Sequence, residues 1–252
     1  MPYAINADVR IHYQVVGTGP PLVLHHWTFS SLDAWYELGY VDALANEHRL
    51  ILIDSRGHGK SDAPHDTAAY RPESRVGDVV AVLDELGVGA ASFFGYSMGG
   101  WIGFCCAKYA PGLFPTFVLG GQHPYAQSME DARSWLRVGE ERGGSAFIDL
   151  WESNVGALLP SQQERMRSFD FTAMIAAAQD RVSLESILRG IDAPCLLFAG
   201  TNDAAYSLAD RAAGQIPRGQ CVSLPGLDHA ETIARCDLVA PLVLEFLKTA
   251  NA

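Results

Sequence analysis

A G-x-S-x-G motif constrains this chain more than any other feature of its sequence. The motif occupies residues 95–99 and has Ser97 at its centre. Residues 91–94 before it predict a short buried strand, and residues 101–110 after it predict a mostly buried helix. A serine in such a strand-to-helix turn has a strained backbone and an exposed hydroxyl. The helix would direct its N-terminal N–H groups toward charge that develops beside Ser97. For the motif alone, a glycine-rich turn without chemistry is the competing interpretation.

Two later residues supply the acid and the base that a serine nucleophile needs. Asp203 follows the apolar run at residues 196–199, and His229 lies in a loop before the last helix. His229 would accept the proton of Ser97, while Asp203 would orient the imidazole and stabilise its charged form. The chain order serine, aspartate, histidine is the order expected for an α/β-hydrolase triad.

Two further segments make the resemblance to the α/β-hydrolase family extend over nearly the whole chain. Residues 17–25 resemble that family's glycine-proline turn into its third strand. Residues 54–62 resemble its D-x-R-G-x-G-x-S loop after the fourth strand. With the serine motif and its two partners, the landmarks occur in the family's order. The resemblance therefore implies an α/β-hydrolase fold and a serine hydrolase activity.

The resemblance also implies an oxyanion hole made by two backbone N–H groups. One belongs to Met98, the residue after the nucleophile, and the other to Trp27. Relatives usually have His-Gly before this position, whereas this chain has His25 and His26. Two alternatives follow: the hole is shifted, or His26 points into the pocket. We predict that His26 contacts the substrate.

Other residues compete for the roles of base and acid. For His25, His58 and His123, a structural or substrate-contact role is the preferred interpretation. Asp228 is a rival acid, but a residue adjacent to His229 cannot readily face its imidazole. Asp54 is another rival, in a position that the family uses structurally.

Aromatic and polar residues near the motif predict a largely apolar cavity for a small or medium substrate. Trp27, Trp35 and Met98 are candidate lining residues. The predicted substrate contacts are His26, Phe29, Tyr96, His123, Tyr125 and Trp151.

The apolar runs alternate with helical patterns, which indicates an α/β fold. We expect a mainly parallel, doubly wound sheet of about eight strands, with helices on both faces and a small helical cap. Residues 9–16 alternate between apolar and polar and predict an antiparallel strand near one edge. The other predicted strands are residues 22–25, 50–54, 92–95, 117–120, 195–199 and 221–224. Residues 71–86 and 237–248 carry the clearest helical spacing.

The alternation stops between residues 121 and 189, which are polar and contain three candidate helices at 129–142, 145–153 and 161–180. We interpret this insertion as a lid over the site, with a purely structural decoration as the alternative. The core domain is then residues 1–120 and 190–252, and the cap is residues 121–189.

Composition limits the protein's surroundings. A net charge of −11 argues against nucleic acid or an anionic membrane as a partner. No basic start with an apolar segment indicates a signal peptide, and no apolar run approaches the ~18 residues that span a bilayer. The five cysteines lie in apolar or helical surroundings, typical of a reducing compartment. We therefore expect a cytoplasmic protein with a small-molecule substrate, and the sequence leaves its oligomeric state open.

We expect no metal and no cofactor. No Cys/His cluster has metal-ligand spacing, and no G-x-G-x-x-G follows the first strand. The run at residues 57–61 resembles a phosphate loop, but Asp54 stands where that motif requires glycine.

The sequence thus predicts a serine hydrolase that cleaves a small or medium apolar ester or lactone through an acyl-enzyme. Relatives with the same triad also hydrolyse thioesters and carbon–carbon bonds, so the bond remains open. A receptor or signalling protein that retains the triad with weak turnover is an alternative from another class. Cofactor-independent oxygenation is a third, favoured by no specific residue.

Overall fold

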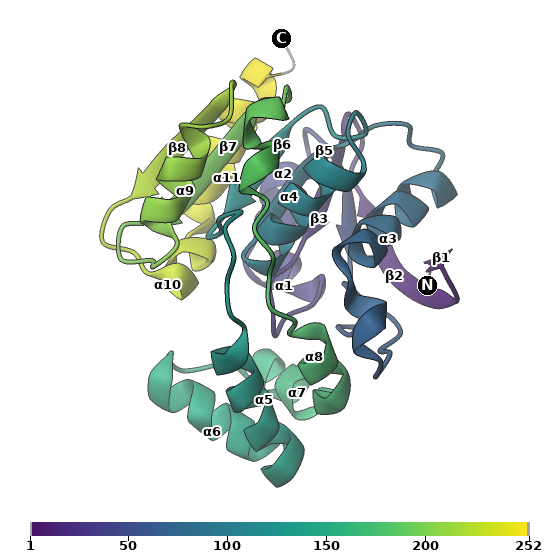
Figure 1. Cartoon of the computed structure of the whole chain (residues 1–252), viewed down its shortest axis with the longest axis vertical. Coiled ribbons are helices and arrows are strands. Elements are labelled where there is room, and N and C mark those ends of the chain that lie inside the picture. Colours follow the sequence, from purple (N-terminus) through teal and green to yellow (C-terminus); the bar gives the residue numbers. More distant parts are fainter. Residues whose placement is uncertain (1, 251–252) are drawn as a thin grey trace.

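A single eight-stranded sheet runs through the centre of the molecule (Figure 1). The computed structural model describes residues 2–250. The strand order is β1-β2-β4-β3-β5-β6-β7-β8. The strands are β1 (Tyr3–Asn6), β2 (Val9–Val16), β3 (Pro21–His25), β4 (Arg49–Ile53), β5 (Ser92–Tyr96), β6 (Phe117–Gly120), β7 (Cys195–Gly200) and β8 (Gly219–Leu224).

The sheet is antiparallel at one edge and parallel elsewhere. Strand β2 pairs antiparallel with both β1 and β4, whereas every pair from β4 to β8 is parallel. The parallel strands from β3 to β7 are largely apolar and buried because helices cover both of their faces, whereas the edge strand β8 is partly exposed. The predicted fold class is therefore confirmed, including the antiparallel strand at residues 9–16.

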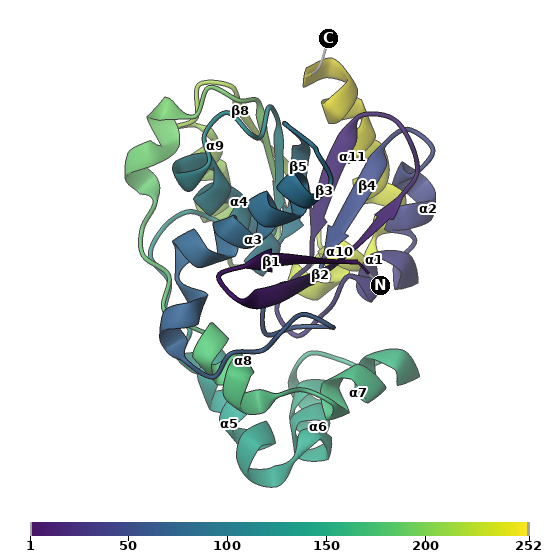
Figure 2. The same cartoon turned by 90° about the vertical axis from the view of Figure 1, so that its right-hand side faces the viewer.

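Alternate residues of each strand face two separate cores. In β4, Leu50 and Leu52 pack on one face of the sheet, while Ile51 and Ile53 pack on the other. Helices α3 (Pro72–Glu85), α4 (Met98–Tyr109) and α9 (Tyr206–Ala213) cover the face of Ile51. Helices α1 (Asp33–Glu37), α2 (Tyr40–Leu44), α10 (His229–Ala234) and α11 (Cys236–Ala250) cover the opposite face. Figure 2 shows α3, α4 and α9 on one side of the sheet and α2 and α11 on the other.

Four helices form the cap, which lies beyond one end of the sheet (Figures 1 and 2). They are α5 (Glu130–Arg142), α6 (Gly144–Asn154), α7 (Pro160–Arg167) and α8 (Phe171–Ala177). Their apolar residues, among them Leu136 and Phe147, make a cluster separate from the two sheet cores. This cluster gives the cap an apolar interior of its own.

The predicted single helix at residues 161–180 is wrong, because the chain breaks it into α7 and α8. The carboxylate of Asp170 accepts a hydrogen bond from Ala173 N–H at 3.0 Å and so caps the start of α8. The Asp170 side chain competes with backbone carbonyl oxygens for N–H donors. It therefore favours the start of a new helix at α8 over continuation of α7.

Several short elements were not predicted. They are β1, α1, α2, α9, α10 and two 3₁₀ turns at Thr67–Tyr70 and Glu185–Gly190. Most are too short for a helical or strand period to be recognised. Within residues 2–250, none of the helices has the length and apolar content that crossing a membrane requires.

Candidate active site

Ser97 occupies the tight turn between β5 and α4. Its backbone angles are φ 51° and ψ −111°, a left-handed conformation that is strained for a residue with a side chain. The glycines of the motif permit the turn. A Cβ atom at Gly95 would lie 2.3 Å from the Gly99 carbonyl oxygen, and one at Gly99 would lie 2.0 Å from that of His25. These close approaches hold Ser97 at the carboxyl edge of the sheet.

His229 and Asp203 come together at the same edge, after β8 and β7. Nδ1 of His229 lies 2.7 Å from Oδ2 of Asp203. The histidine side chain is 46 % exposed and the aspartate side chain 4 %, so the imidazole reaches the cavity while the carboxylate is shielded. Burial by itself would raise the pKa of Asp203. The hydrogen bond and charge of His229, with the N–H of Ala205, outweigh it and hold that pKa below its ordinary value. The carboxylate is therefore charged at neutral pH.

The two rival acids are occupied elsewhere. Asp228 is the N-cap of α10 and accepts a hydrogen bond from Glu231 N–H at 2.8 Å. Asp54 is buried and contacts His12 Nδ1, and it accepts from the N–H groups of Leu32 and Lys60. Asp54 therefore has a structural role, since it connects the backbone at Leu32 to the backbone at Lys60.

A cavity of about 450 Å³ lies between the carboxyl edge of the sheet and the cap. Ser97, Asp203 and His229 all line it. Of the predicted substrate contacts, it also contains Phe29, His123 and Trp151. The remaining lining residues are Trp27, Thr28, Gly121, Gln122, Gln127, Met129, Ala132, Arg181, Ala204, Ala205 and Leu208. Apolar rings with a few polar groups are typical of a small-molecule site.

Two backbone donors near Ser97 are free to stabilise an anion. Among residues 2–250, the N–H groups of Met98 and Trp27 have no acceptor within the protein. Met98 begins α4, so its N–H belongs to the first turn, where helices leave their donors unpaired. These are the two donors that the sequence predicted for the oxyanion hole.

The structure places His26 away from the cavity, contrary to the prediction that it contacts the substrate. The ring is fully buried and lies outside the cavity lining. Its Nε2 accepts a hydrogen bond from Ser55 N–H at 3.1 Å, and its Nδ1 contacts the Trp27 carbonyl oxygen at 2.8 Å. Both nitrogens therefore hold backbone segments, and the ring connects the Trp27 loop to the loop after β4.

Tyr96 and Tyr125 also lie outside the cavity, contrary to prediction. The strand alternation turns Tyr96 into the core on the side opposite α4, where its hydroxyl donates to the His229 carbonyl oxygen at 2.6 Å. The Tyr125 hydroxyl accepts from Gln215, and its ring packs beneath the guanidinium of Arg211. Two other cavity candidates also lie outside this lining: Trp35 is fully buried beside Tyr40 and Phe94, and the Met98 side chain is buried too.

Sequence reasoning missed Arg181, Gln122 and Gln127, which line the cavity from both ends of the cap. An isolated β-bridge pairs Gln127 with Arg181, and each donates its N–H to the other's carbonyl oxygen. No motif marks these residues. Across residues 2–250, no group of three or more His, Cys, Asp or Glu side chains is arranged to hold a metal ion.

Comparison with known proteins identifies the family. The model of the alpha/beta hydrolase fold matches residues 20–178. The chain belongs to this family. Its eight-stranded sheet, turn serine and helical cap agree with that membership.

Relatives of this hydrolase differ in the reaction they are named for. A 2-hydroxy-6-oxononadienedioate/2-hydroxy-6-oxononatrienedioate hydrolase from Burkholderia vietnamiensis is 38% identical, over 96% of this chain and 92% of its own. A putative 2-succinyl-6-hydroxy-2,4-cyclohexadiene-1-carboxylate synthase from Bacillus subtilis is 27% identical, over 96% and 97%. The crystal structure of an enol-lactonase from Burkholderia xenovorans superposes with a TM-score of 0.86 at 26% identity and covers 98% of this chain and all of its own.

Proposed function

We propose that this hydrolase cleaves a carboxylic ester or lactone of small or medium size through an acyl-enzyme on Ser97. The observation that carries the proposal is the 2.7 Å contact between His229 and Asp203 at the cavity that Ser97 also lines. With Nδ1 held by a carboxylate, the other nitrogen of His229 is the one available to a proton on Ser97.

The reaction has two steps, acylation of Ser97 and hydrolysis of the acyl-enzyme. His229 takes the hydroxyl proton of Ser97 while Oγ attacks the carbonyl carbon, and the carbonyl electron pair moves onto oxygen. The Met98 and Trp27 N–H groups stabilise that negative charge. The intermediate then reforms the carbonyl and expels the alkoxide, which takes the proton from His229. Water, activated by His229, attacks the acyl-enzyme in the same way and releases the acid.

The cavity supports a small or medium substrate rather than a polymer. Its volume of about 450 Å³ lies within the range of small-molecule sites. Because Met129 and Trp151 come from residues 121–189, we assign this segment the role of a lid that excludes water.

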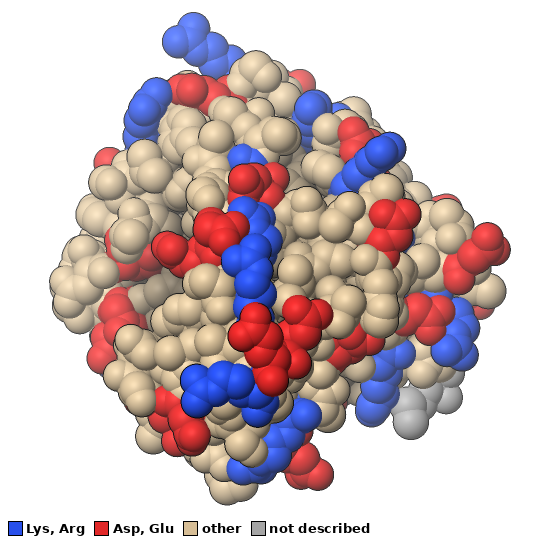
Figure 3. Space-filling view, turned by 60° about the horizontal axis from the view of Figure 1, so that its bottom comes forward, with Lys and Arg blue, Asp and Glu red and all other residues tan. Residues whose placement is uncertain are grey.

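A cytoplasmic location and a small-molecule partner are part of the proposal. All five cysteines are free thiols, which suits a reducing compartment. On the face that carries the cap, basic and acidic side chains are interspersed among uncharged residues (Figure 3). Such a face has no extended basic surface for nucleic acid.

Carbon–carbon bond hydrolysis is the second candidate, and the 38% identical relative named for a dienedioate hydrolase favours it. The same triad would serve that cleavage, with a carbanion in place of the alkoxide as the leaving group. A panel containing 4-nitrophenyl esters, a lactone and a vinylogous diketone separates the two.

The test is turnover of that panel by the wild type, Ser97→Ala and Ser207→Ala. Ser207 is an exposed serine of α9 outside the cavity and provides the matched control. We expect ester or lactone turnover that is lost in Ser97→Ala and kept in Ser207→Ala. Ester turnover by Ser97→Ala within tenfold of wild type would refute the covalent mechanism. Wild type inert toward the whole panel, yet able to bind its members, would favour the receptor alternative.

A further inference from the structure

Two buried arginines beside the catalytic cavity have no carboxylate partner. Arg181 is 8 % exposed and Arg75 is 4 % exposed. Among residues 2–250, neither takes part in an ion pair, although Arg56, an equally buried arginine, is paired with Asp78. A charge removed from water without a counter-ion is costly. Two such cations near one another therefore call for an explanation.

The hydrogen bonds of the two side chains go to neutral groups, and Asp78, whose charge favours the Arg75 cation, is already paired with Arg56. Arg75 donates to the carbonyl oxygens of Tyr70 at 3.2 Å and Ala177 at 2.6 Å, and to the sulfur of Met98 at 3.7 Å. Arg181 donates through Nη1 to the side-chain oxygen of Gln127 at 2.9 Å. All of these acceptors are neutral.

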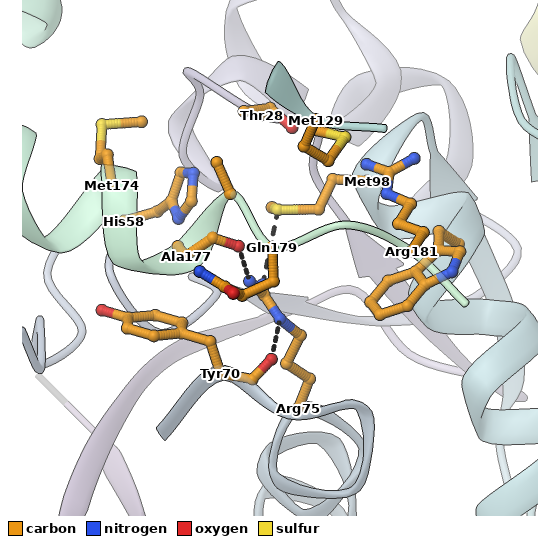
Figure 4. A pocket seen from close by; sticks show the side chains of 12 residues that line it. Thr28, His58, Tyr70, Arg75, Met98, Met129, Met174, Ala177, Gln179 and Arg181 are labelled. Atoms are coloured by element: carbon orange, nitrogen blue, oxygen red, sulfur yellow. Dashed lines mark hydrogen bonds between the residues drawn. The ribbon is translucent and has the colours of Figure 1, made fainter. Parts of the chain in front are cut away.

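The positions of the two guanidinium groups link them to the active site. Arg181 lines the 450 Å³ cavity together with Ser97 and His229. It also lines a second, smaller cavity of about 30 Å³, into which Arg75 points from α3. Figure 4 shows both guanidinium groups around this smaller space, with the Met98 side chain beside them. Thr28 and Met129 border both cavities, so the two spaces adjoin.

The lining of the small cavity favours an anion. It contains no Asp or Glu side chain, and besides the two arginines it contains Trp101, whose buried indole nitrogen has no partner. The Arg181 guanidinium lies over the Trp101 ring at 5.4 Å from its centre, a cation–π contact. Burial and the charge of Arg75 lower the pKa of Arg181 to about 9, so it remains a cation at neutral pH.

We propose that Arg181, supported by Arg75, forms an anion subsite that binds a carboxylate carried by the substrate. The proposal rests on the proposed hydrolase function and adds the charge of its substrate. Arg181 has N–H groups beyond the one given to Gln127, and a carboxylate accepts such donors in pairs. The counter-ion missing from the folded protein is then supplied by the substrate, which gains affinity because the cations are already desolvated and oriented.

The test compares charged and neutral substrates of matched shape. One pair carries the charge on the acyl part: mono-4-nitrophenyl adipate against 4-nitrophenyl hexanoate. The other carries it on the leaving group: 4-carboxyphenyl acetate against phenyl acetate. The variants are Arg181→Met, which keeps the length without charge, Arg181→Lys, and Arg211→Met as a control at an exposed arginine outside both cavities.

We expect the wild type to prefer the charged member of at least one pair. Arg181→Met should reduce that preference, the ratio of the two kcat/KM values, by about 10- to 100-fold. Arg181→Lys should retain part of it, and Arg211→Met should leave it unchanged. Equal rates for charged and neutral members in the wild type, or a preference that survives Arg181→Met, would overturn the subsite while leaving the hydrolase function intact.

A binding measurement keeps the inference testable if no ester is turned over. Adipate and the neutral diol 1,6-hexanediol are titrated calorimetrically into Ser97→Ala and into the Ser97→Ala/Arg181→Met double variant, both checked by thermal melting. Binding of adipate but not of the diol, lost on removal of Arg181, supports the subsite. Adipate binding that is absent, or independent of Arg181, refutes it.

Discussion

The Tyr96 hydroxyl donates a hydrogen bond of 2.6 Å to the backbone carbonyl of His229. Tyr96 is the last residue of β5 and immediately precedes Ser97. The hydrogen bond therefore connects the end of β5 to the first residue of α10, 133 residues later in the sequence. The ring of Tyr96 also packs against the imidazole, with 5.2 Å between the ring centres. The tyrosine is therefore a positioning residue for the proposed base.

Tyr96→Phe should test that role, because it removes the hydroxyl and keeps the packing. We expect kcat to fall by about 3- to 30-fold with little change in KM, together with a loss of about 1 kcal/mol of stability. Tyr36→Phe, which removes an exposed hydrogen bond to Gln14, is the control and should change none of these.

Asp203→Asn should lower kcat by about 10⁴-fold, because an amide can hold the imidazole in the wrong tautomer and cannot stabilise its charge. Asp228→Asn should have little effect on kcat, since Asp228 caps α10 instead of facing the imidazole. Steady-state ester hydrolysis by both variants measures this. Loss of activity in Asp228→Asn with full activity in Asp203→Asn would reverse the assignment.

His26→Gly should act mainly on stability. The change removes a buried ring and leaves the Ser55 N–H without an acceptor, which costs about 2–4 kcal/mol. Because the ring also contacts the Trp27 carbonyl, we expect a fall in kcat of less than tenfold. Urea unfolding measures the loss of stability, and ester kinetics measure the loss of kcat. A 10²- to 10³-fold loss of kcat with unchanged stability would instead indicate direct contact with the substrate or oxyanion.

The folded protein should lose stability as the pH falls below about 6.5. Burial lowers the pKa of His25 to about 3, that of His58 to about 4, and that of His26 well below its ordinary value. Below the unfolded pKa of about 6.5, the unfolded chain binds protons that the folded chain refuses, so acid favours unfolding. The cost is on the order of 2 kcal/mol per histidine at pH 5.

Urea midpoints measured between pH 7.5 and 5 check this expectation. His58→Asn, which removes one of these buried imidazoles, should flatten the decline. A midpoint that stays constant over this range would contradict the buried neutral state of the three histidines.

The sequence predicted the arrangement of the fold and the chemistry that depends on short-range pattern. Ser97, Asp203 and His229 each follow a predicted strand, and the carboxyl ends of parallel strands share one edge of a sheet. Their convergence was therefore predictable before any distance was known. The glycines at 95 and 99 likewise predict the tight turn at Ser97, because a side chain at either position would clash with neighbouring backbone.

The side-chain directions in the loops were not predictable in the same way. His26 turns toward Ser55 N–H, a partner that only the folded loop after β4 supplies. For Tyr96 a signal existed, because the period of two in a strand places it on the same face as Phe94. Arg181 lies where the cap returns to the sheet, and its neighbours Trp101 and Arg75 are distant in sequence. Nothing local in the chain marks it as part of the site.

The central claim is that Ser97 is the nucleophile, and covalent labelling tests it most directly. The protein is treated with a serine-directed fluorophosphonate, and the adduct is mapped by mass spectrometry of its peptides, with Ser97→Ala and Asp203→Asn in parallel. We predict one adduct per chain on Ser97, absent in Ser97→Ala and formed much more slowly in Asp203→Asn. An adduct on another residue, or undiminished labelling of Ser97→Ala, would contradict it.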